Sequence, residues 1–170
     1  MKLRKLEPKD ASRMLQWMHD PDAVAHLQGR FLEKNLQDCL NFIADSQNCE
    51  DKLHLAIADC EDTYLGTVSL KHIDWQEKDA EFAIAIHPDA MGTGCAQWAM
   101  SEILHKGLTE LKLRRIFWCV SPENHRAVRF YEKGGYPQVE AQNINAQRYY
   151  TPQLTMQLLW YCAESTQGER

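Results

Sequence analysis

Two glycines in the middle of the chain could form an anion-binding loop. Gly92 and Gly94 flank Thr93, after an apolar strand-like run and before the helical spacing that starts at Ala96. Glycine lets the backbone turn sharply, so that successive N–H groups converge on an anion. The N-terminus of the following helix adds partial positive charge. The segment therefore fits a pyrophosphate, although an ordinary strand-to-helix turn explains the two glycines equally well.

Two other nucleotide-binding loops are excluded by the surrounding residues. No Gly-Lys-Ser/Thr follows the glycines, as a Walker loop requires. Ala96 and Gln97 stand after Gly94, where a dinucleotide-binding fingerprint would have its third glycine. The preceding strand also belongs to a meander, whereas that fingerprint follows the first strand of a β-α-β unit.

The elements that must position this loop follow from hydrophobic spacing and turn residues. Period-two or β-rich runs predict strands at residues 3–7, 53–57, 64–73, 80–86, 115–120, 136–140 and 154–161. Stripes at helical spacing predict helices at residues 11–18, 32–43, 96–106 and 124–133. A β-meander followed by β-α crossovers indicates an α/β (α+β) fold, a mixed sheet with helices on both faces.

Composition bounds the class of protein. The 170 residues include 24 acidic against 19 basic side chains, for a formal net charge of −5. We expect one domain over residues 1–163 and a flexible tail over 164–170. Neither a membrane span nor a secretory signal is expected, and the acidic balance argues against a nucleic-acid partner. Six cysteines without Cys-x-x-Cys or zinc-type spacing indicate reduced thiols, no metal and a cytoplasmic protein.

Two longer segments carry more information than the glycines alone. Residues 81–96 read Glu-Phe-Ala-Ile-Ala-Ile-His-Pro-Asp-Ala-Met-Gly-Thr-Gly-Cys-Ala, and residues 124–136 read Asn-His-Arg-Ala-Val-Arg-Phe-Tyr-Glu-Lys-Gly-Gly-Tyr. In this order, with a strand between them, they resemble the GNAT superfamily of acetyl-CoA-dependent N-acetyltransferases. The resemblance extends over residues 3–161. It implies the GNAT fold, with a mostly antiparallel sheet of six to seven strands, and acetyl-CoA as co-substrate.

Three positions depart from the family pattern. Asp89 opens the loop where relatives have Gln or Arg, Thr93 replaces a basic residue between the glycines, and Tyr136 replaces Phe. Because backbone N–H groups hold the phosphates, we expect cofactor binding to survive these changes.

The resemblance also implies roles for single residues. Acetyl transfer needs a base for the amine, a hydrogen-bond donor for the thioester oxygen and an acid for the leaving thiolate. Tyr131 matches the acid, although its helical spacing also suits a core aromatic. Glu81 matches the base, although an exposed carboxylate at a strand edge fits as well. The carbonyl donor is expected at a backbone N–H of Ala85 or Ile86.

The cofactor contacts follow in the same way. Asn124 matches a residue that binds the pantetheine arm, and it is equally suited to cap a helix. Further contacts implied by the resemblance are Met91, Gly92, Thr93, Gly94, Cys95, Ala96 and Arg129.

The resemblance also implies that the acceptor is a primary amine, in a polyamine, an amino sugar or a protein N-terminus, which attacks directly in a ternary complex. Residues 17–24 resemble the Rim-type ribosomal-protein, spermidine and amino-sugar acetyltransferases. Candidate acceptor contacts are Trp17, Phe31 and His72, whereas Trp17 also suits the core. His54, His72 and His87 are weaker candidates for the base, and His87 is interpreted as solvated.

A catalytically silent acyl-CoA-binding module is the alternative function. The retained Glu81, Asn124 and Tyr131 favour the enzyme. The apolar residues Leu158, Leu159 and Trp160 of the last expected strand are candidates for a homodimer interface.

Overall fold

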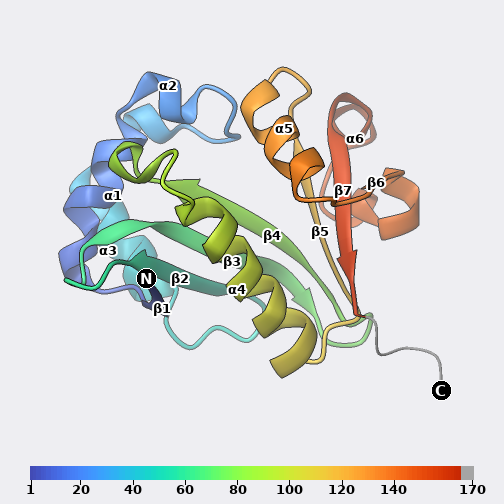
Figure 1. Ribbon diagram of the computed structural model, residues 1–170, viewed down its shortest axis with the longest axis horizontal. Coiled ribbons are helices and arrows are strands. Elements are labelled where there is room, and N and C mark those ends of the chain that lie inside the picture. Colours follow the sequence, from blue (N-terminus) through green and yellow to red (C-terminus); the bar gives the residue numbers. More distant parts are fainter. Residues whose placement is uncertain (166–170) are drawn as a thin grey trace.

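The computed structural model describes residues 1–165, which form a seven-stranded sheet with helices on both faces (Figure 1). The strands are β1 (Lys2–Lys5), β2 (Leu53–Ala58), β3 (Tyr64–Asp74), β4 (Asp79–Ile86), β5 (Arg115–Val120), β6 (Gln138–Val139) and β7 (Leu159–Glu164). The helices are α1 (Ala11–Met18), α2 (Pro21–Val24), α3 (Leu36–Asp45), α4 (Cys95–His105), α5 (His125–Lys133) and α6 (Pro152–Gln157).

The strand order places one short parallel pair inside an antiparallel sheet. The order is β1-β2-β3-β4-β5-β7-β6, and the β4–β5 pair is parallel while the others are antiparallel. That pair runs only from Asp79↔Arg115 to Glu81↔Phe117. Beyond Glu81 the two strands diverge (Figure 1), because β4 stays with β3 and β5 stays with β7. The expected mixed, mostly antiparallel sheet is confirmed.

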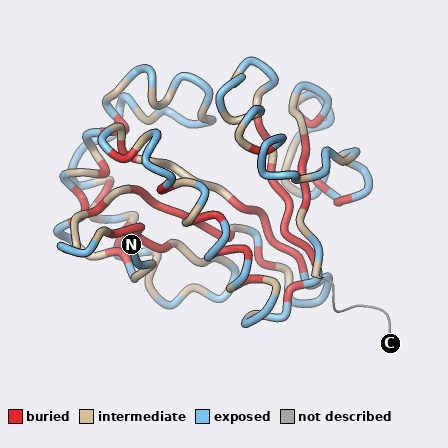
Figure 2. Tube along the Cα trace, in the orientation of Figure 1, coloured by how far each residue is buried: buried red, intermediate tan, exposed pale blue. Residues whose placement is uncertain are grey.

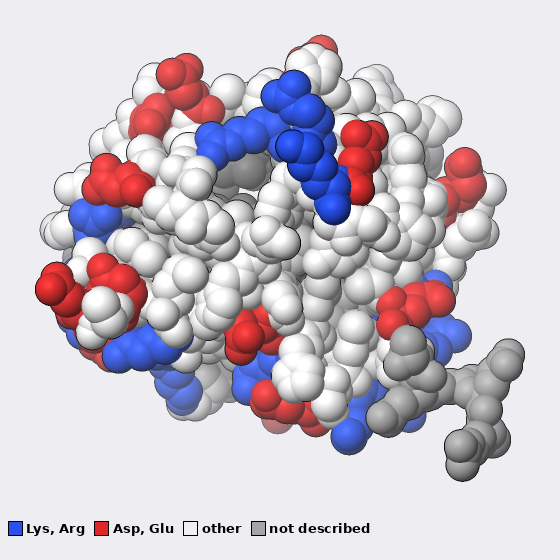
Figure 3. Space-filling view, viewed as in Figure 1, with Lys and Arg blue, Asp and Glu red and all other residues white. Residues whose placement is uncertain are grey.

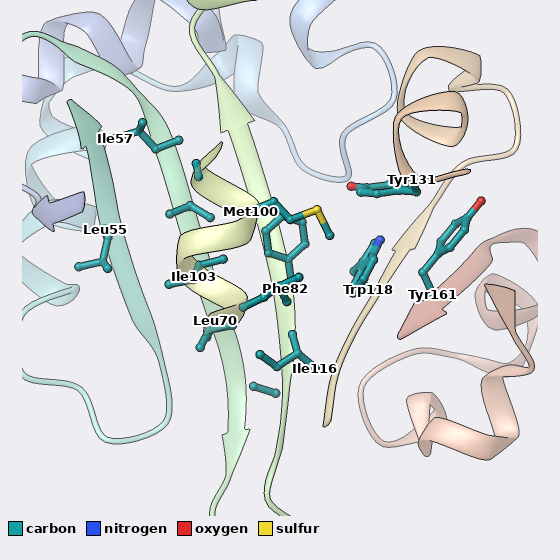
Figure 4. Packing of buried hydrophobic residues seen from close by; sticks show 14 of the residues in the cluster. Leu55, Ile57, Leu70, Phe82, Met100, Ile103, Ile116, Trp118, Tyr131 and Tyr161 are labelled. Carbon is teal, nitrogen blue, oxygen red and sulfur yellow. The ribbon is translucent and has the colours of Figure 1, made fainter. Parts of the chain in front are cut away.

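Apolar side chains cover both faces of the sheet, as the period-two alternation of strands requires. The trace of the central strands is largely buried (Figure 2). On one face, α4 packs against the central strands through Ala99, Met100, Ile103, Leu70, Phe82 and Ile116 (Figure 4). On the other face, α1 and α3 pack against the sheet through Met14, Trp17, Cys39, Ile43, Ala56 and Tyr64.

Helix α3 begins four residues later than its apolar stripe predicts. Asn35 and Asp38 form a capping box, in which each side chain accepts a hydrogen bond from the other residue's N–H (3.1 and 2.9 Å). Leu32 lies outside this helix, in a short 3-10 turn, and is exposed. In the described part of the chain, no helix has the length and apolar character needed to cross a membrane.

The C-terminal region differs most from expectation. The strand expected over 154–161 is replaced by α6 and by β7, which begins at Leu159. Thr151 caps α6 by accepting the N–H of Leu154 (3.3 Å), and Pro152 occupies the first helical position, where no N–H is needed.

The end of the chain also departs from the expected tail. β7 runs through Glu164, and Ser165 donates its N–H to the carbonyl of Arg114 (2.8 Å). The domain therefore extends past residue 163. The remainder of the expected tail, 166–170, lies outside the described residues.

Candidate active site

A cavity of about 800 Å³ occupies the gap where β4 and β5 diverge. The β4 wall consists of Phe82, Ala83, Ile84 and Ala85, and the facing wall of Trp118, Cys119, Val120 and Ser121. Further lining residues expected from the sequence are Glu81, Asn124, Tyr131, Trp17 and Phe31. The cavity thus joins residues expected to handle the cofactor with residues expected to handle the acceptor.

The glycine loop lies between β4 and α4. Gly92 and Gly94 have φ angles of +78° and +84°, which residues with a Cβ rarely adopt. Gly94 is the N-cap of α4, so the first N–H groups of that helix have no intrahelical acceptor. A Cβ at either glycine would meet nothing within 4 Å, so the loop borders open space. This geometry fits the pyrophosphate expected there.

Basic side chains of α5 lie near this loop. Arg126, Arg129 and Lys133 are exposed, and Figure 3 shows Lys and Arg side chains gathered over α5 beside a hollow. Nη1 of Arg126 lies 3.0 Å from Sδ of Met91 in the loop. Their positive charge suits the phosphates of CoA. The Thr93 hydroxyl instead donates to the carbonyl of Ala90 (2.7 Å) and closes the loop on itself.

Asp89, at the position where relatives have Gln or Arg, connects the loop to α1. Its Oδ2 lies 3.1 Å from Nη2 of Arg13. His87 is buried, so the expectation of a solvated histidine is wrong. Its Nδ1 accepts the N–H of Asp89 (3.2 Å), and its Nε2 lies 2.9 Å from Oε1 of Gln16. Burial, together with the charge of Arg13, lowers the pKa of His87. His87 therefore supports the loop and is not a wall of the cavity.

Backbone N–H groups of β4 face the gap beyond the last β5 pair. His87 donates its N–H to the carbonyl of Leu65 on the β3 side (2.8 Å). Because N–H direction alternates along a strand, the N–H of Ala85 also points toward β3, and those of Ile84 and Ile86 point toward the gap. Of the two expected carbonyl donors, Ile86 fits and the N–H of Ala85 does not, although Ala85 lines the cavity.

Glu81 lies where the two strands begin to diverge, and it is only 3% exposed. The exposed-carboxylate interpretation is therefore wrong. Its Oε1 accepts a hydrogen bond from the Tyr150 hydroxyl and lies 3.4 Å from Nζ of Lys71. Its Oε2 has no hydrogen-bond partner within residues 1–165, and Nε2 of His72 lies 3.6 Å away. A buried carboxylate oxygen without a partner is unfavourable, and Glu81 is itself a wall of the cavity.

Tyr131 is both a core aromatic and a wall of the cavity. Its ring packs against Trp118 and Tyr161, with centroid distances of 5.5 and 5.2 Å. Figure 4 shows its hydroxyl end on the side of β4. No residue in the described chain hydrogen-bonds this hydroxyl. Burial raises the pKa of Tyr131 above its ordinary value, so the group keeps its proton at neutral pH and can donate it.

The remaining cofactor candidates, Asn124, Cys95 and Ala96, differ in which of their atoms a cofactor could reach. Oδ1 of Asn124 accepts the N–H of Ala127 (3.1 Å) and caps α5, while the residue also lines the cavity. The capping interpretation of Asn124 is therefore confirmed, and the pantetheine contact stays a prediction that its place in the cavity wall allows. The Cys95 side chain is fully buried in the core, so its backbone alone can reach a cofactor. Ala96 is half-buried in the first turn of α4.

Two of the three acceptor candidates line the cavity. The Trp17 and Phe31 rings lie 5.3 Å apart, and Trp17 Nε1 donates to the Tyr64 hydroxyl (3.1 Å). His72 is not a wall of the cavity, because its φ of +50° lies in an irregular stretch of β3 and its ring stacks on Tyr149. The expected role of His72 in binding the acceptor is therefore not supported by its position.

His54 lines the cavity on the acceptor side. Its Nδ1 lies 2.7 Å from the hydroxyl oxygen of Ser69. Burial, followed by the charges of Lys52 and Lys71, lowers the pKa of His54 to about 4. The imidazole is therefore neutral near pH 7.

The sequence did not single out Lys71, Cys119 or Tyr150 as functional, although all three line the cavity. Lys71 could have been found from the sequence, because the short turn between the two expected strands pairs Lys71 with Glu81. Tyr150 could not, because 69 positions separate it from Glu81.

Comparisons with known proteins identify relatives of this chain. Residues 1–137 match the family described as "Acetyltransferase (GNAT) domain". The spermidine N(1)-acetyltransferase of Escherichia coli (strain K12) is 28% identical over 138 residues, covering 80% of this chain and 72% of that protein. The crystal structure of spermidine N-acetyltransferase from Vibrio cholerae in complex with CoA and spermine superposes with a TM-score of 0.74 at 23% identity, covering 81% of each chain. Because the family match spans most of its length, this chain belongs to the GNAT acetyltransferases, enzymes that use acetyl-CoA as co-substrate.

Proposed function

We propose that this enzyme acetylates a primary amine of a polyamine by direct attack in a ternary complex with acetyl-CoA. The observation that carries this proposal is that one cavity is lined by both Glu81 and Tyr131. Similarity to the spermidine acetyltransferases of Escherichia coli and Vibrio cholerae supports the acceptor class.

The acceptor end of the cavity suits a long cation. Asp38 and Asp45 of α3 both line it, and their spacing of seven residues puts them on the same face of the helix. Aromatic rings of Trp17, Phe31 and Phe42 line the same region and can contact ammonium groups or methylene chains. A polyamine could place one amine at Glu81 and keep further cationic groups near these carboxylates.

The chain's own groups divide the chemistry among them. The amine must be neutral to attack, and Glu81 in the cavity wall can take its proton. Gap-facing N–H groups of Ile84 and Ile86 can donate to the carbonyl oxygen as charge develops there. Tyr131 can give its proton to the departing sulfur. Acetyl-CoA supplies the activated thioester.

Release of CoA thiol across an amine panel tests the proposal. The panel holds spermidine, spermine, putrescine, an amino-sugar nucleotide and short peptides with Ser, Ala or Met at the N-terminus. We expect turnover with the polyamines, and a loss of about 100-fold in kcat for Tyr131→Phe. Tyr136→Phe is the matched control, because its hydroxyl has no partner within residues 1–165.

Two results would contradict this function. Turnover confined to peptides or amino sugars would reject the polyamine as acceptor. No turnover with any amine, despite thermal stabilisation by acetyl-CoA, would favour the catalytically silent acyl-CoA-binding module.

The cellular location and the oligomeric state also belong to this proposal. The six free thiols suit a reducing cytoplasm. Trp160 is buried in its own protomer, and β7 lies between β5 and β6. Part of the surface expected to form a dimer interface is therefore covered within one chain. Light scattering, compared with the 19.7 kDa of one chain, tests a homodimer through another surface.

A further inference from the structure

A short segment after β6 lies against the hairpin that carries Glu81. In residues 148–150, Arg148 donates from Nη2 to both carboxylate oxygens of the fully buried Asp79 (2.9 and 2.8 Å). Its Nη1 donates to Asp74 at the turn of the same hairpin (2.9 Å). Two ionic contacts thus fix the position of this segment on β3 and β4.

The next two residues continue along the same hairpin. The Tyr149 ring stacks on His72, with centroids 4.1 Å apart and planes 10° from parallel. The Tyr150 hydroxyl then reaches Oε1 of Glu81. Three consecutive side chains therefore contact the hairpin: Arg148 pairs with Asp79, Tyr149 stacks on His72, and Tyr150 donates to Glu81.

Tyr150 is held from the sides as well. Its ring lies nearly perpendicular to that of Trp160, with the ring centroids 5.1 Å apart. Sγ of Cys119 lies 3.7 Å from its hydroxyl. Burial raises the pKa of Tyr150 well above its ordinary value, so the hydroxyl keeps its proton. It therefore acts as a fixed donor to the carboxylate.

The two oxygens of Glu81 consequently have different environments. Oε1 has the Tyr150 hydroxyl and Lys71 beside it, whereas Oε2 is buried with no hydrogen-bond partner in the described chain. We propose that Tyr150 is the positioning residue of the base: its hydrogen bond to Oε1 fixes the orientation of the Glu81 carboxylate in the wall of the cavity, where that carboxylate takes the proton of the attacking amine. This inference rests on the proposed function, in which Glu81 is that base.

A pH profile can isolate this hydrogen bond. The titratable groups around Glu81 come from β3, β5 and the 148–150 segment; they are Lys71, His72, Cys119, Tyr149 and Tyr150. Tyr150→Phe removes one donor and leaves the other groups unchanged. Because a hydrogen bond to a carboxylate favours its charged form, the acidic limb of kcat/KM should move to higher pH, by roughly one unit.

A double-mutant cycle tests whether Tyr150 acts through Glu81. We expect Tyr150→Phe to lower kcat about tenfold for spermidine, with the KM for acetyl-CoA unchanged, and to have no further effect in Glu81→Gln. Tyr136→Phe is the control for loss of a tyrosine hydroxyl. Thermal stabilisation by acetyl-CoA shows that each variant binds the co-substrate and is folded.

The outcomes separate the two proposals. Equal losses from Tyr150→Phe in both backgrounds, or an unmoved acidic limb, overturn the positioning role and leave Glu81 as the base. Full activity in Glu81→Gln overturns both the base and the residue said to position it.

Discussion

Burial sets the protonation of the groups around the cavity at the scale of single residues. Tyr131 and Tyr150 keep their protons because burial disfavours the phenolate. His54 stays neutral for the same reason, because burial disfavours the imidazolium. The Tyr150 hydroxyl is therefore a neutral donor to Glu81, which also lies 3.4 Å from Nζ of Lys71. In the proposed mechanism, Glu81 takes a proton from the amine and Tyr131 gives one to the departing sulfur.

His54 gives a prediction about stability and pH. Its pKa of about 4 lies below the 6.5 of an unfolded chain, so the unfolded state binds more protons between those values. The stabilisation is complete above pH 6.5 and is lost as the pH falls through 4. Between pH 7 and 5, wild type should lose about 2 kcal/mol more unfolding free energy than His54→Gln. Urea unfolding at both pH values measures this difference.

The control for that experiment is another histidine. His105 is exposed near the end of α4, so His105→Gln should keep the pH dependence of wild type. The same slope in His54→Gln and wild type would contradict the assigned burial effect.

At the scale of elements, the sequence predicted what local signals determine. Glycines at 92 and 94 indicated the loop, and Asn124 indicated the start of α5, because conformation and capping depend on neighbouring residues. Helix α6 was missed although Thr151-Pro152 is an ordinary start signal, because apolar residues after it favoured a strand.

The active site itself depends on pairings that local signals do not contain. The divergence of β4 and β5 arises because each follows a different antiparallel partner beyond Glu81. The hydrogen bond from Tyr150 to Glu81 joins segments far apart in the chain. The sequence could therefore supply Glu81, Tyr131 and Asn124 by resemblance, but not the groups that orient them.

Two glycine variants should separate an effect on stability from an effect on cofactor affinity. Gly94→Ala places a side chain at φ +84°, which costs about 1 kcal/mol. Gly135→Ala, at φ +73° after α5, should lose similar stability. Only Gly94→Ala should also weaken CoA binding, by about tenfold, because its strain is released by moving the N–H groups that we propose bind the phosphates. Calorimetric titration with CoA and thermal melting measure the two effects. Equal affinity losses in both variants would contradict a phosphate-binding role for this loop.

At the scale of the whole molecule, the gap between β4 and β5 is bordered by different elements on its two sides. Residues of α5 line the cavity, and Arg126 of that helix contacts Met91 of the glycine loop, whereas α1, α3 and Phe31 line the acceptor region. Because β4 forms one wall throughout, both substrates can meet without a movement of the sheet. The fold thus favours simultaneous binding over sequential occupation of one site.

Simultaneous binding predicts the kinetic pattern. The thiols of Cys39 and Cys119 line the cavity and could in principle carry an acetyl group between substrates. Burial raises the pKa of both thiols, that of Cys119 to about 11, so neither is a thiolate near neutral pH. Since the thiolate is the nucleophile, direct attack by the amine is favoured. Initial rates with acetyl-CoA and spermidine varied together should give intersecting double-reciprocal lines. Parallel lines, with an acetylated Cys119 peptide in enzyme treated with acetyl-CoA alone, would instead establish a covalent intermediate and require a conformation in which that thiol is ionised.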